Sequence, residues 1–587
     1  MKSFLKFTLA SIVGVLISSL IIFLIVIAIV AAIVSSTEKE VAIKDNSILK
    51  IELNKPIPER SSDNPFENFD FKNFKPSVSI GLTDILKNIK AAKTDPKIRG
   101  IYLELSTIPS GAAVIEEIRS ALLDFKTSKK FIISYADIYT HGTYYLASVS
   151  DSIFLNPMGE LTFLGLRSEQ LFFKGTLEKL DIEPQIIRHG KFKSAVEPLI
   201  NEKMSDANRE QMNTLLSSIW NHMVEGISKQ RKISKTELNR LADEMIIRNA
   251  NAALEHKLID GLRYKDEILA RLSKQTGGKP DKDPEFVGLS QYNKVPKSRK
   301  DFPKNKIAVI YACGDIMMGK GEDDNIGSDN LSATIRTARR DSSIKAIVLR
   351  INSPGGSAQA SDIIWRELSL AVKAKPLIVS MGTVAASGGY YIAAPADTIV
   401  AEPTTITGSI GVFGVLLNAK NFFNKKLGIT TDVAQTNKHA DLGSIYRPLS
   451  AEEKEVIQAE VENIYDVFLS RVSSGRKMSK AAVDEIGQGR VWSATDAKRI
   501  GLVDILGGMD KAIEIAAKKA KLKDYRVVEL PKLEDPFSSL ISEFSAKVRS
   551  NIVNTELGNE QYIYQNIKKT LNRQGILTRM PYDINFY

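Results

Sequence analysis

Two glycine-rich segments in the C-terminal half of the chain carry the residue types of an acyl-transfer site. They are Asn352-Ser-Pro-Gly-Gly-Ser357 and Ala385-Ala-Ser-Gly-Gly-Tyr390. Adjacent glycines let a backbone approach a ligand closely and leave amide N–H groups pointing at it. A serine at the start of a helix also lies in the positive field of the helix N-terminus. The pair of segments therefore predicts Ser387 as a nucleophile, with the N–H groups of Gly355 and Gly388 as oxyanion donors.

A serine nucleophile requires a base, and the composition limits what that base could be. The chain has five histidines, none of which forms a His-x-x-x-His pair: His141, His189, His222, His256 and His439. A helical metal-binding pair is thus absent from the sequence. A lysine that is buried among apolar groups can lose its proton near neutral pH, so lysine is a second candidate. The residue types alone do not choose one lysine among so many.

The single cysteine, Cys313, allows neither an intramolecular disulfide nor a Cys-based zinc site. The charge balance is +11, from 80 basic and 69 acidic residues. Such a charge could suit a membrane surface or nucleic acid, but a solvated basic surface is the simpler interpretation. The chain shows no arginine-rich stripe interleaved with aromatic residues, so we expect no nucleic-acid partner.

The elements that must position these residues occur twice. Ile101-Tyr-Leu-Glu-Leu105 matches Ile347-Val-Leu-Arg-Ile351 at an offset of 347 − 101 = 246. His141-Gly-Thr-Tyr-Tyr-Leu-Ala-Ser148 matches Ser387-Gly-Gly-Tyr-Tyr-Ile-Ala-Ala394 at the same offset, and Leu258–Leu262 matches Leu502–Leu506 at 244. Two copies indicate a tandem duplication rather than a solenoid.

The first copy serves as an internal control for the two glycine-rich segments. Each segment alone would equally fit a structural turn. In the first copy, however, His141 stands in place of Ser387, and Ile108-Pro-Ser110 stands in place of Pro354-Gly-Gly356. If the serine and the glycines were needed only for the turns, the first copy should also have kept them. The difference favours chemistry at Ser387.

Each copy alternates apolar runs with helical stretches, which predicts an α/β fold with a mostly parallel sheet. In the second copy the expected strands are Ile307–Tyr311, Ala346–Ile351, Leu377–Met381 and Thr398–Ala401, and the expected helices are about Ser357–Lys373, Gly388–Ala394 and Ala451–Ser473. We expect the first copy over residues 45–273, a polar linker over 274–305, the second copy over 306–525 and a C-terminal tail over 526–587. The tail includes Phe537–Phe544, which could form an amphipathic or a peripheral packing helix.

The N-terminus carries a targeting signal. Lys2 and Lys6 precede an uncharged stretch from Phe7 to Thr37 that is dominated by Leu, Ile, Val and Ala. About 20 apolar residues span a bilayer, whereas a cleavable signal peptide has an apolar region of about 7–15 residues. We therefore expect an uncleaved membrane anchor over residues 1–40. The lysines before the span, and the acidic Glu38 and Glu40 after it, predict that the rest of the chain lies on the outer side of the membrane.

Four segments together resemble the long, duplicated form of the signal peptide peptidase A (protease IV) family. They are Asn352-Ser-Pro-Gly-Gly-Ser357, Ala385-Ala-Ser-Gly-Gly-Tyr-Tyr391, Thr407-Gly-Ser-Ile-Gly-Val412 and Lys193-Ser-Ala-Val-Glu-Pro198. Val491–Ala497 followed by Gly501-Leu-Val-Asp504 also looks like that family, and the resemblance covers residues 45–520. It implies a tandem pair of crotonase-like, or Clp-protease-like, domains behind one transmembrane helix.

The resemblance also selects the lysine. It implies that Ser387 attacks a peptide carbonyl, that Lys193 from the first copy accepts the serine proton, and that Ser409 hydrogen-bonds the lysine and holds it in place. No metal or organic cofactor is implied. The implied substrates are cleaved signal peptides and other apolar, unfolded peptides. The implied state is a homotetramer in the inner (cytoplasmic) membrane, with a single pass and a periplasmic catalytic domain.

Three other interpretations remain open from the residues. Ala385-Ala-Ser-Gly-Gly389 is close to the Gly-x-Ser-x-Gly turn of α/β-hydrolases, and Asp432 and His439 follow in the order of that fold. A crotonase-type acyl-CoA enzyme would share the fold and the oxyanion loops. A catalytically inactive membrane scaffold would share the duplication and the anchor.

Overall fold

The computed structural model describes residues 42–61, 79–295, 303–321, 324–532 and 575–580, short N-terminal pieces (6–8, 11–19 and 21) and a small hairpin, β2 (Phe69–Asp70) with β3 (Lys75–Pro76). Among these residues, no helix is both long enough and apolar enough to cross a membrane. Most of the expected anchor, Phe7–Thr37, lies outside the described residues, and so does Phe537–Phe544.

The first copy is built on a six-stranded parallel sheet in the order β8-β6-β5-β4-β1-β9. Its strands are β1 (Ser47–Ile51), β4 (Ile98–Leu105), β5 (Phe131–Tyr139), β6 (Ser152–Leu161), β8 (Gly261–Leu262) and β9 (Phe286–Gly288). Its helices are α2 (Leu82–Thr94), α3 (Ala112–Lys126), α4 (His141–Ala147), α5 (Lys174–Lys179), α6 (Glu197–Ile200), α7 (Asp206–Arg231), α8 (Lys235–Asp243), α9 (Ala250–Glu255), α10 (Lys265–Gln275) and α11 (Leu289–Asn293). The strands read as near-continuous apolar runs because helices cover both faces of a parallel sheet.

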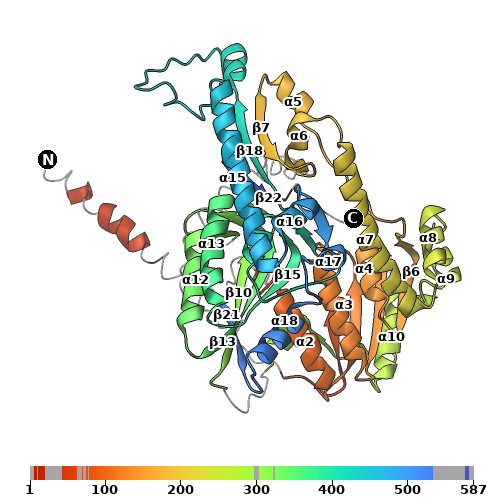
Figure 1. Ribbon diagram of the computed structural model, residues 1–587. Coiled ribbons are helices and arrows are strands. Elements are labelled where there is room, and N and C mark those ends of the chain that lie inside the picture. The colour runs from red at the N-terminus through yellow and green to blue at the C-terminus, as the bar shows by residue number, and fades with distance from the viewer. Residues whose placement is uncertain are drawn as a thin grey trace.

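The second copy repeats this plan around the order β19-β17-β15-β13-β10-β21, with β16 and β20 branching from β15. Its strands are β10 (Lys306–Cys313), β13 (Ile344–Ser353), β15 (Leu377–Ala386), β16 (Thr398–Ala401), β17 (Ile406–Gly408), β19 (Val491–Ser493), β20 (Ile505–Leu506) and β21 (Arg526–Leu530). Its helices are α12 (Ser328–Arg340), α13 (Ala358–Ala371), α14 (Gly388–Ala393), α15 (Ala451–Arg476), α16 (Lys480–Ile486), α17 (Ala494–Arg499) and α18 (Met509–Lys519). Figure 1 shows α12 and α13 on one side of this sheet.

The duplication is visible element by element. Helix α2 and helix α12 begin 328 − 82 = 246 residues apart, and α3 and α13 begin 358 − 112 = 246 apart. The long helices α7 and α15 begin 451 − 206 = 245 residues apart and have 26 residues each. The mixed α/β fold and the tandem repeat expected from the sequence are therefore present.

Two short strands lie close to the expected boundaries of the copies. The stretch 274–305, expected as a linker, contains β9 and α11, and β9 pairs in parallel with β1. The tail expected after residue 525 begins with β21, which pairs in parallel with β10. In each copy, a late strand thus closes the edge of the sheet beside the copy's own first strand. These strands are too short to show a clear period in the sequence.

A third sheet joins the two copies in the order β12-β11-β14-β22-β18-β7. Its strands are β7 (Glu183–His189), β11 (Asp315–Met317), β12 (Asn325–Gly327), β14 (Gly355–Ser357), β18 (Val412–Asn418) and β22 (Gly575–Arg579). Strand β7 belongs to the first copy, whereas β22 comes from the far end of the chain. In Figure 1 two of its strands, β7 and β18, rise beside α15 in the upper part of the molecule.

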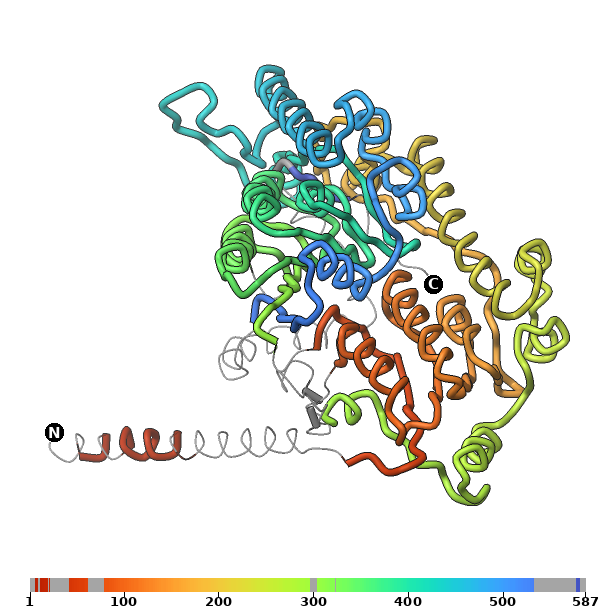
Figure 2. The backbone as a smooth tube through the Cα atoms, turned by 60° about the horizontal axis from the view of Figure 1, so that its bottom comes forward, coloured from red at the N-terminus to blue at the C-terminus, as the bar shows by residue number. Residues whose placement is uncertain are grey.

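The two copies also share a core and a buried ionic cluster. Ala386, Ile406 and Val491 of the second copy pack into the main core of the first. Fully buried Arg350 of β13 contacts Glu59 and Glu117 of the first copy. Figure 2 shows α18 running between the second sheet and helices α2 and α3. The copies therefore form one packed body, and this packing fixes the first copy's loops relative to the second copy's sheet.

Candidate active site

Ser387 occupies the turn between β15 and α14, at the carboxyl end of a central strand. Its backbone is held at φ 54° and ψ −115°, a strained conformation for a residue other than glycine, and its N–H donates to Gly408 O at 2.8 Å. A serine at a helix N-cap ordinarily bonds an amide of the first turn, but the Ser387 side chain makes no such bond. The hydroxyl is therefore available to another partner, and it is fully buried.

That partner is Lys193, which reaches the site from the first copy. Strand β7 pairs antiparallel with β18 over all seven of its residues, from Glu183 opposite Asn418 to His189 opposite Val412. Lys193 follows four residues later. Because β18 belongs to the second copy, this pairing delivers the Lys193 loop to the carboxyl ends of the second sheet.

Polar contacts then hold the loop that carries Lys193. Buried Glu197 accepts hydrogen bonds from Ser205 Oγ at 2.5 Å and from Asn208 Nδ2 at 2.9 Å, which ties the loop to the start of α7. Gln211 of α7 donates to Phe192 O at 3.0 Å and accepts from the N–H of Val491 in the second copy at 3.2 Å. Glu197 therefore has a structural role in holding this loop.

The lysine amine has three close oxygen partners. Lys193 Nζ lies 2.8 Å from Ser387 Oγ, 3.0 Å from Ser409 Oγ and 3.1 Å from Ser409 O. All three residues are fully buried. A neutral amine has two N–H groups and one lone pair, so it can donate to both Ser409 oxygens while it accepts the Ser387 proton. The geometry matches the needs of a general base.

Burial also favours the neutral form of this lysine. Desolvation alone moves the pKa of Lys193 well below its ordinary value of 10.5. The ring of Phe413 lies 5.9 Å from Nζ, and Gly489 and Gly411 pack against the lysine stem. A Cβ built on Gly489 would lie 2.6 Å from Lys193 Cβ, so a side chain there would displace the lysine.

The two candidate oxyanion donors, Gly355 and Gly388, lie together at the Ser387 turn. Gly388 is the first residue of α14, and Gly355 has φ 99°, a conformation that favours glycine. A Cβ built on Gly355 would lie 2.7 Å from Gly388 N, so the two glycines are neighbours. The Gly355 N–H donates to Ser353 Oγ at 3.2 Å in this arrangement.

The residues of the histidine-based alternative are not gathered at Ser387. His439 lies on the arm between β18 and α15, where its ring nitrogens face Glu452 and Glu453 at 3.3 and 3.2 Å. Asp432 is on the same arm and is exposed.

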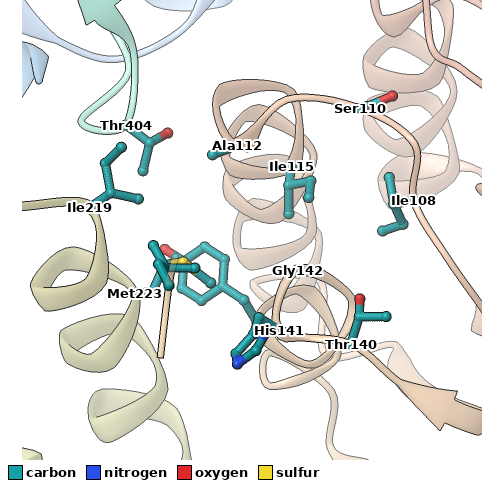
Figure 3. A pocket seen from close by; sticks show the side chains of 12 residues that line it. Ile108, Ser110, Ala112, Ile115, Thr140, His141, Gly142, Ile219, Met223 and Thr404 are labelled. Carbon is teal, nitrogen blue, oxygen red and sulfur yellow. The ribbon is translucent and has the colours of Figure 1, made fainter. Parts of the chain in front are cut away.

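A separate cavity of about 50 Å³ marks the corresponding place in the first copy. His141, Thr140, Ile108 and Ser110 line it, as do Met223 of α7 and Thr404 of the second copy (Figure 3). The His141 Nε2 accepts a hydrogen bond from the Leu164 N–H at 2.9 Å. This cavity is small, and no lysine lines it.

Sequence reasoning missed three contributors to the site. Gly489 gives Lys193 its space, Gln211 ties the lysine loop to the second copy, and β22 lies beside the candidate oxyanion glycines. The short Gly487-Gln-Gly489 run was a possible signal for the first. Neither Gln211 nor β22 stands in a recognisable pattern.

Comparison with known proteins gives matches over most of the chain. A model described as "Peptidase family S49" matches residues 124–279 and 370–523, and one described as "Clp protease" matches residues 300–405. "Protease 4" of Salmonella typhi is 39% identical over 456 residues, which cover 76% of this chain and 73% of that protein. "Protease 4" of Haemophilus influenzae is 38% identical over 448 residues (74% and 72%). "Serine protease SPPA, chloroplastic" of Arabidopsis thaliana is 34% identical over 508 residues (85% and 74%).

Proposed function

The chain belongs to peptidase family S49 and is a serine peptidase, and from this premise we propose that it cleaves peptides with a Ser387–Lys193 dyad whose two members come from different copies of the repeat. The observation that carries the proposal is the 2.8 Å separation of Lys193 Nζ and Ser387 Oγ in a fully buried setting. Desolvation lowers the pKa of Lys193, and this supports its role as a base.

Catalysis would proceed in two stages. Lys193 accepts the Ser387 proton as Oγ attacks the substrate carbonyl, and the N–H groups of Gly388 and Gly355 stabilise the oxyanion. Lys193 then protonates the leaving amine, and an acyl-enzyme remains on Ser387. Water hydrolyses this ester with Lys193 again as base. Ser409 positions the amine throughout, through its two contacts at 3.0 and 3.1 Å.

The wider biology of the enzyme follows from its family resemblance. We propose crotonase-like domains over residues 45–273 and 306–525, with the first supplying the base and the second the nucleophile. The substrates would be cleaved signal peptides and other apolar, unfolded segments. An uncleaved anchor over residues 1–40, a periplasmic catalytic region and a homotetramer complete the proposal. The apolar run Phe7–Thr37 supports the anchor.

A quenched fluorescent peptide with an apolar centre tests the dyad. Ser387→Ala should lower kcat/KM by at least about 10³-fold, since the nucleophile is lost. His439→Ala should stay within about twofold of the unchanged enzyme, because His439 faces Glu452 and Glu453. Full activity of Ser387→Ala would contradict the proposal, and loss of activity in folded His439→Ala would favour the histidine-based hydrolase. An unchanged enzyme that cleaves no peptide would favour the scaffold.

A further inference from the structure

The last residue of β7, His189, joins the Lys193 loop to the long helix α15 of the second copy. Its ring stacks on the ring of Tyr465, with the centroids 3.9 Å apart and an interplanar angle of 25°. Its Nδ1 lies 2.6 Å from Glu462 Oε2, about one turn earlier on the same face of α15. Strand β7 lies beside this helix (Figure 1), and Lys193 follows His189 by four residues. The end of β7 is therefore held at two points just before the lysine.

Tyr465 also holds a tight turn of the second copy, residues 487–490. The tyrosine is buried, and its hydroxyl donates to Asp484 Oδ1 at 2.6 Å and accepts from the Gln488 N–H at 3.2 Å. Gln488 has φ 53°, a left-handed conformation that is uncommon for a residue other than glycine. Such a conformation persists only where the surrounding structure holds it, and the Tyr465 hydroxyl supplies one of the contacts that do so.

This turn packs directly against Lys193. The Phe192 N–H donates to Gln488 O at 2.8 Å. A Cβ built on Gly489 would lie 2.6 Å from both the N and the Cβ of Lys193. On its other side, the turn accepts a hydrogen bond at its last carbonyl from the N–H of Ser409, at 2.7 Å. A shift of the turn would therefore displace the lysine and its serine neighbour together.

We propose that His189 is a positioning residue for Lys193, acting through Tyr465 and the turn 487–490. This inference rests on the proposed dyad, to which it adds the group that sets the place of the base. The His189 ring contacts α15 rather than the nucleophile, so it acts through the backbone that it holds. A displacement of about 1 Å can lower a catalytic rate about 100-fold, so we expect the contact to affect the rate of cleavage more than the stability of the fold.

The duplication offers an internal comparison for this role. The residue 245 positions after His189, the offset of α7 and α15, is Ala434. Ala434 is exposed on the arm between β18 and α15 and carries no ring. At the same offset from Lys193 stands Lys438, which is also exposed. The stacking ring is thus present in the copy whose lysine lies at Ser387 and is missing from the copy whose lysine faces solvent.

The pH profile of peptide cleavage by the full-length enzyme tests the proposal. His189→Ala should lower kcat for the apolar peptide about 10- to 100-fold and leave KM within about twofold, because the base and not the peptide is displaced. A loosely held lysine is better hydrated, so the pH at which kcat levels off should move upward, toward the ordinary lysine pKa of 10.5.

The matched control is His256→Ala. The side chain of His256 is 26% exposed, against 25% for His189, and it lies at the end of α9. This variant should keep both the kcat and the pH profile of the unchanged enzyme.

Three further variants divide the contact into its parts. His189→Phe keeps a ring to stack on Tyr465 and should keep kcat within about threefold. His189→Asn keeps an N–H donor for Glu462 without the ring, and should behave as His189→Ala. Tyr465→Phe keeps the stacked ring but removes the hydroxyl from Gln488, and it should move the pH profile upward even if His189→Ala fails to fold. An active His189→Asn beside an inactive His189→Phe would overturn the route through Tyr465.

The outcomes separate this inference from the dyad on which it rests. An inactive Lys193→Met beside an unchanged kcat and pH profile in His189→Ala would overturn the positioning role alone. A lower kcat in His189→Ala with an unshifted pH profile would also overturn it, since partial unfolding reduces the amount of active enzyme but not the pH at which Lys193 loses its proton. A folded, fully active Lys193→Met would overturn the dyad and the inference with it.

Discussion

The two copies build the same strand–turn–helix at the end of their central strands, yet only the second places a serine there, the proposed nucleophile Ser387. In the first copy, α4 begins with an ordinary capping box between Thr140 and Thr143, and His141 is its first residue. In the second, Ser387 stands at the N-cap with a strained backbone and no capping bond. The second copy has thus lost a local stabilising interaction, and the proposed mechanism requires this loss, since a capping hydroxyl would not be free to attack.

The other residues of the proposed site also differ between the copies. The residue 246 positions before Ser409 is Phe163, which is buried and packs on Trp220. The residue 245 positions after Lys193, the offset of α7 and α15, is Lys438. Its side chain is 71% exposed and pairs with Glu452 at 2.6 Å. Each copy therefore carries a lysine at this place, but only Lys193 is enclosed by the other copy.

The largest expected effect comes from replacing each of these two lysines separately with methionine. Lys193→Met should lower kcat/KM by at least about 10³-fold, because it removes the base while the apolar stem remains. Lys438→Met should change it less than twofold, since Lys438 is exposed and has no contact with Ser387. The apolar-peptide assay measures both. A folded Lys193→Met enzyme with normal activity would remove the basis for a dyad split between the copies.

An effect on stability should follow at the interface between the copies. Arg350, fully buried with Glu59 and Glu117, corresponds to Glu104 in the first copy (350 − 246), which pairs with Lys50 at 2.7 Å near the surface. Arg350→Met would leave two carboxylates unpaired in the interior and should cost about 3–5 kcal/mol of unfolding free energy. Glu104→Gln should cost about 1 kcal/mol or less.

Urea unfolding of both variants measures this difference. Equal losses of stability would mean that the buried cluster does not hold the copies together more strongly than a surface pair does.

The last expected effect is the pH dependence that the enclosed lysine confers, which is modest for each pH unit. Only neutral Lys193 can act as base, so kcat/KM should rise about tenfold per pH unit below its lowered pKa and then level off. Between that lowered pKa and 10.5, the unfolded chain binds a proton that the folded chain does not. Stability should therefore rise with pH in this window, by up to about 1.4 kcal/mol per unit.

Urea unfolding of the unchanged enzyme at several pH values measures this slope, with Lys193→Met as the control. The control should lack the contribution of the lysine. Identical slopes for the two proteins would contradict the burial of a neutral lysine.

Much of the fold could be predicted from the sequence, because its longer strands and helices correspond to contiguous runs of residues. The expected strand Thr398–Ala401 is β16, and the expected helix Ala451–Ser473 begins where α15 begins. The expected strand Leu377–Met381 was too short, since β15 continues to Ala386 through pairing with β17. Strand β9 was missed because its three residues are stabilised mainly by their pairing with β1, a non-local contact.

By itself, the sequence determined the duplication, the family and the turn that carries Ser387, because each is a pattern that can be recognised along the linear chain. The motif resemblance named Lys193, but only the tertiary structure decided that its amine lies 2.8 Å from Ser387 across 387 − 193 = 194 residues of chain. The lowered pKa of that lysine also arises in three dimensions, because desolvation is the cause and Phe413, Gly411 and Gly489 of the other copy pack around the side chain. The same holds for β22, whose place beside Gly355 and Gly388 depends on backbone pairing with strands far away in the sequence.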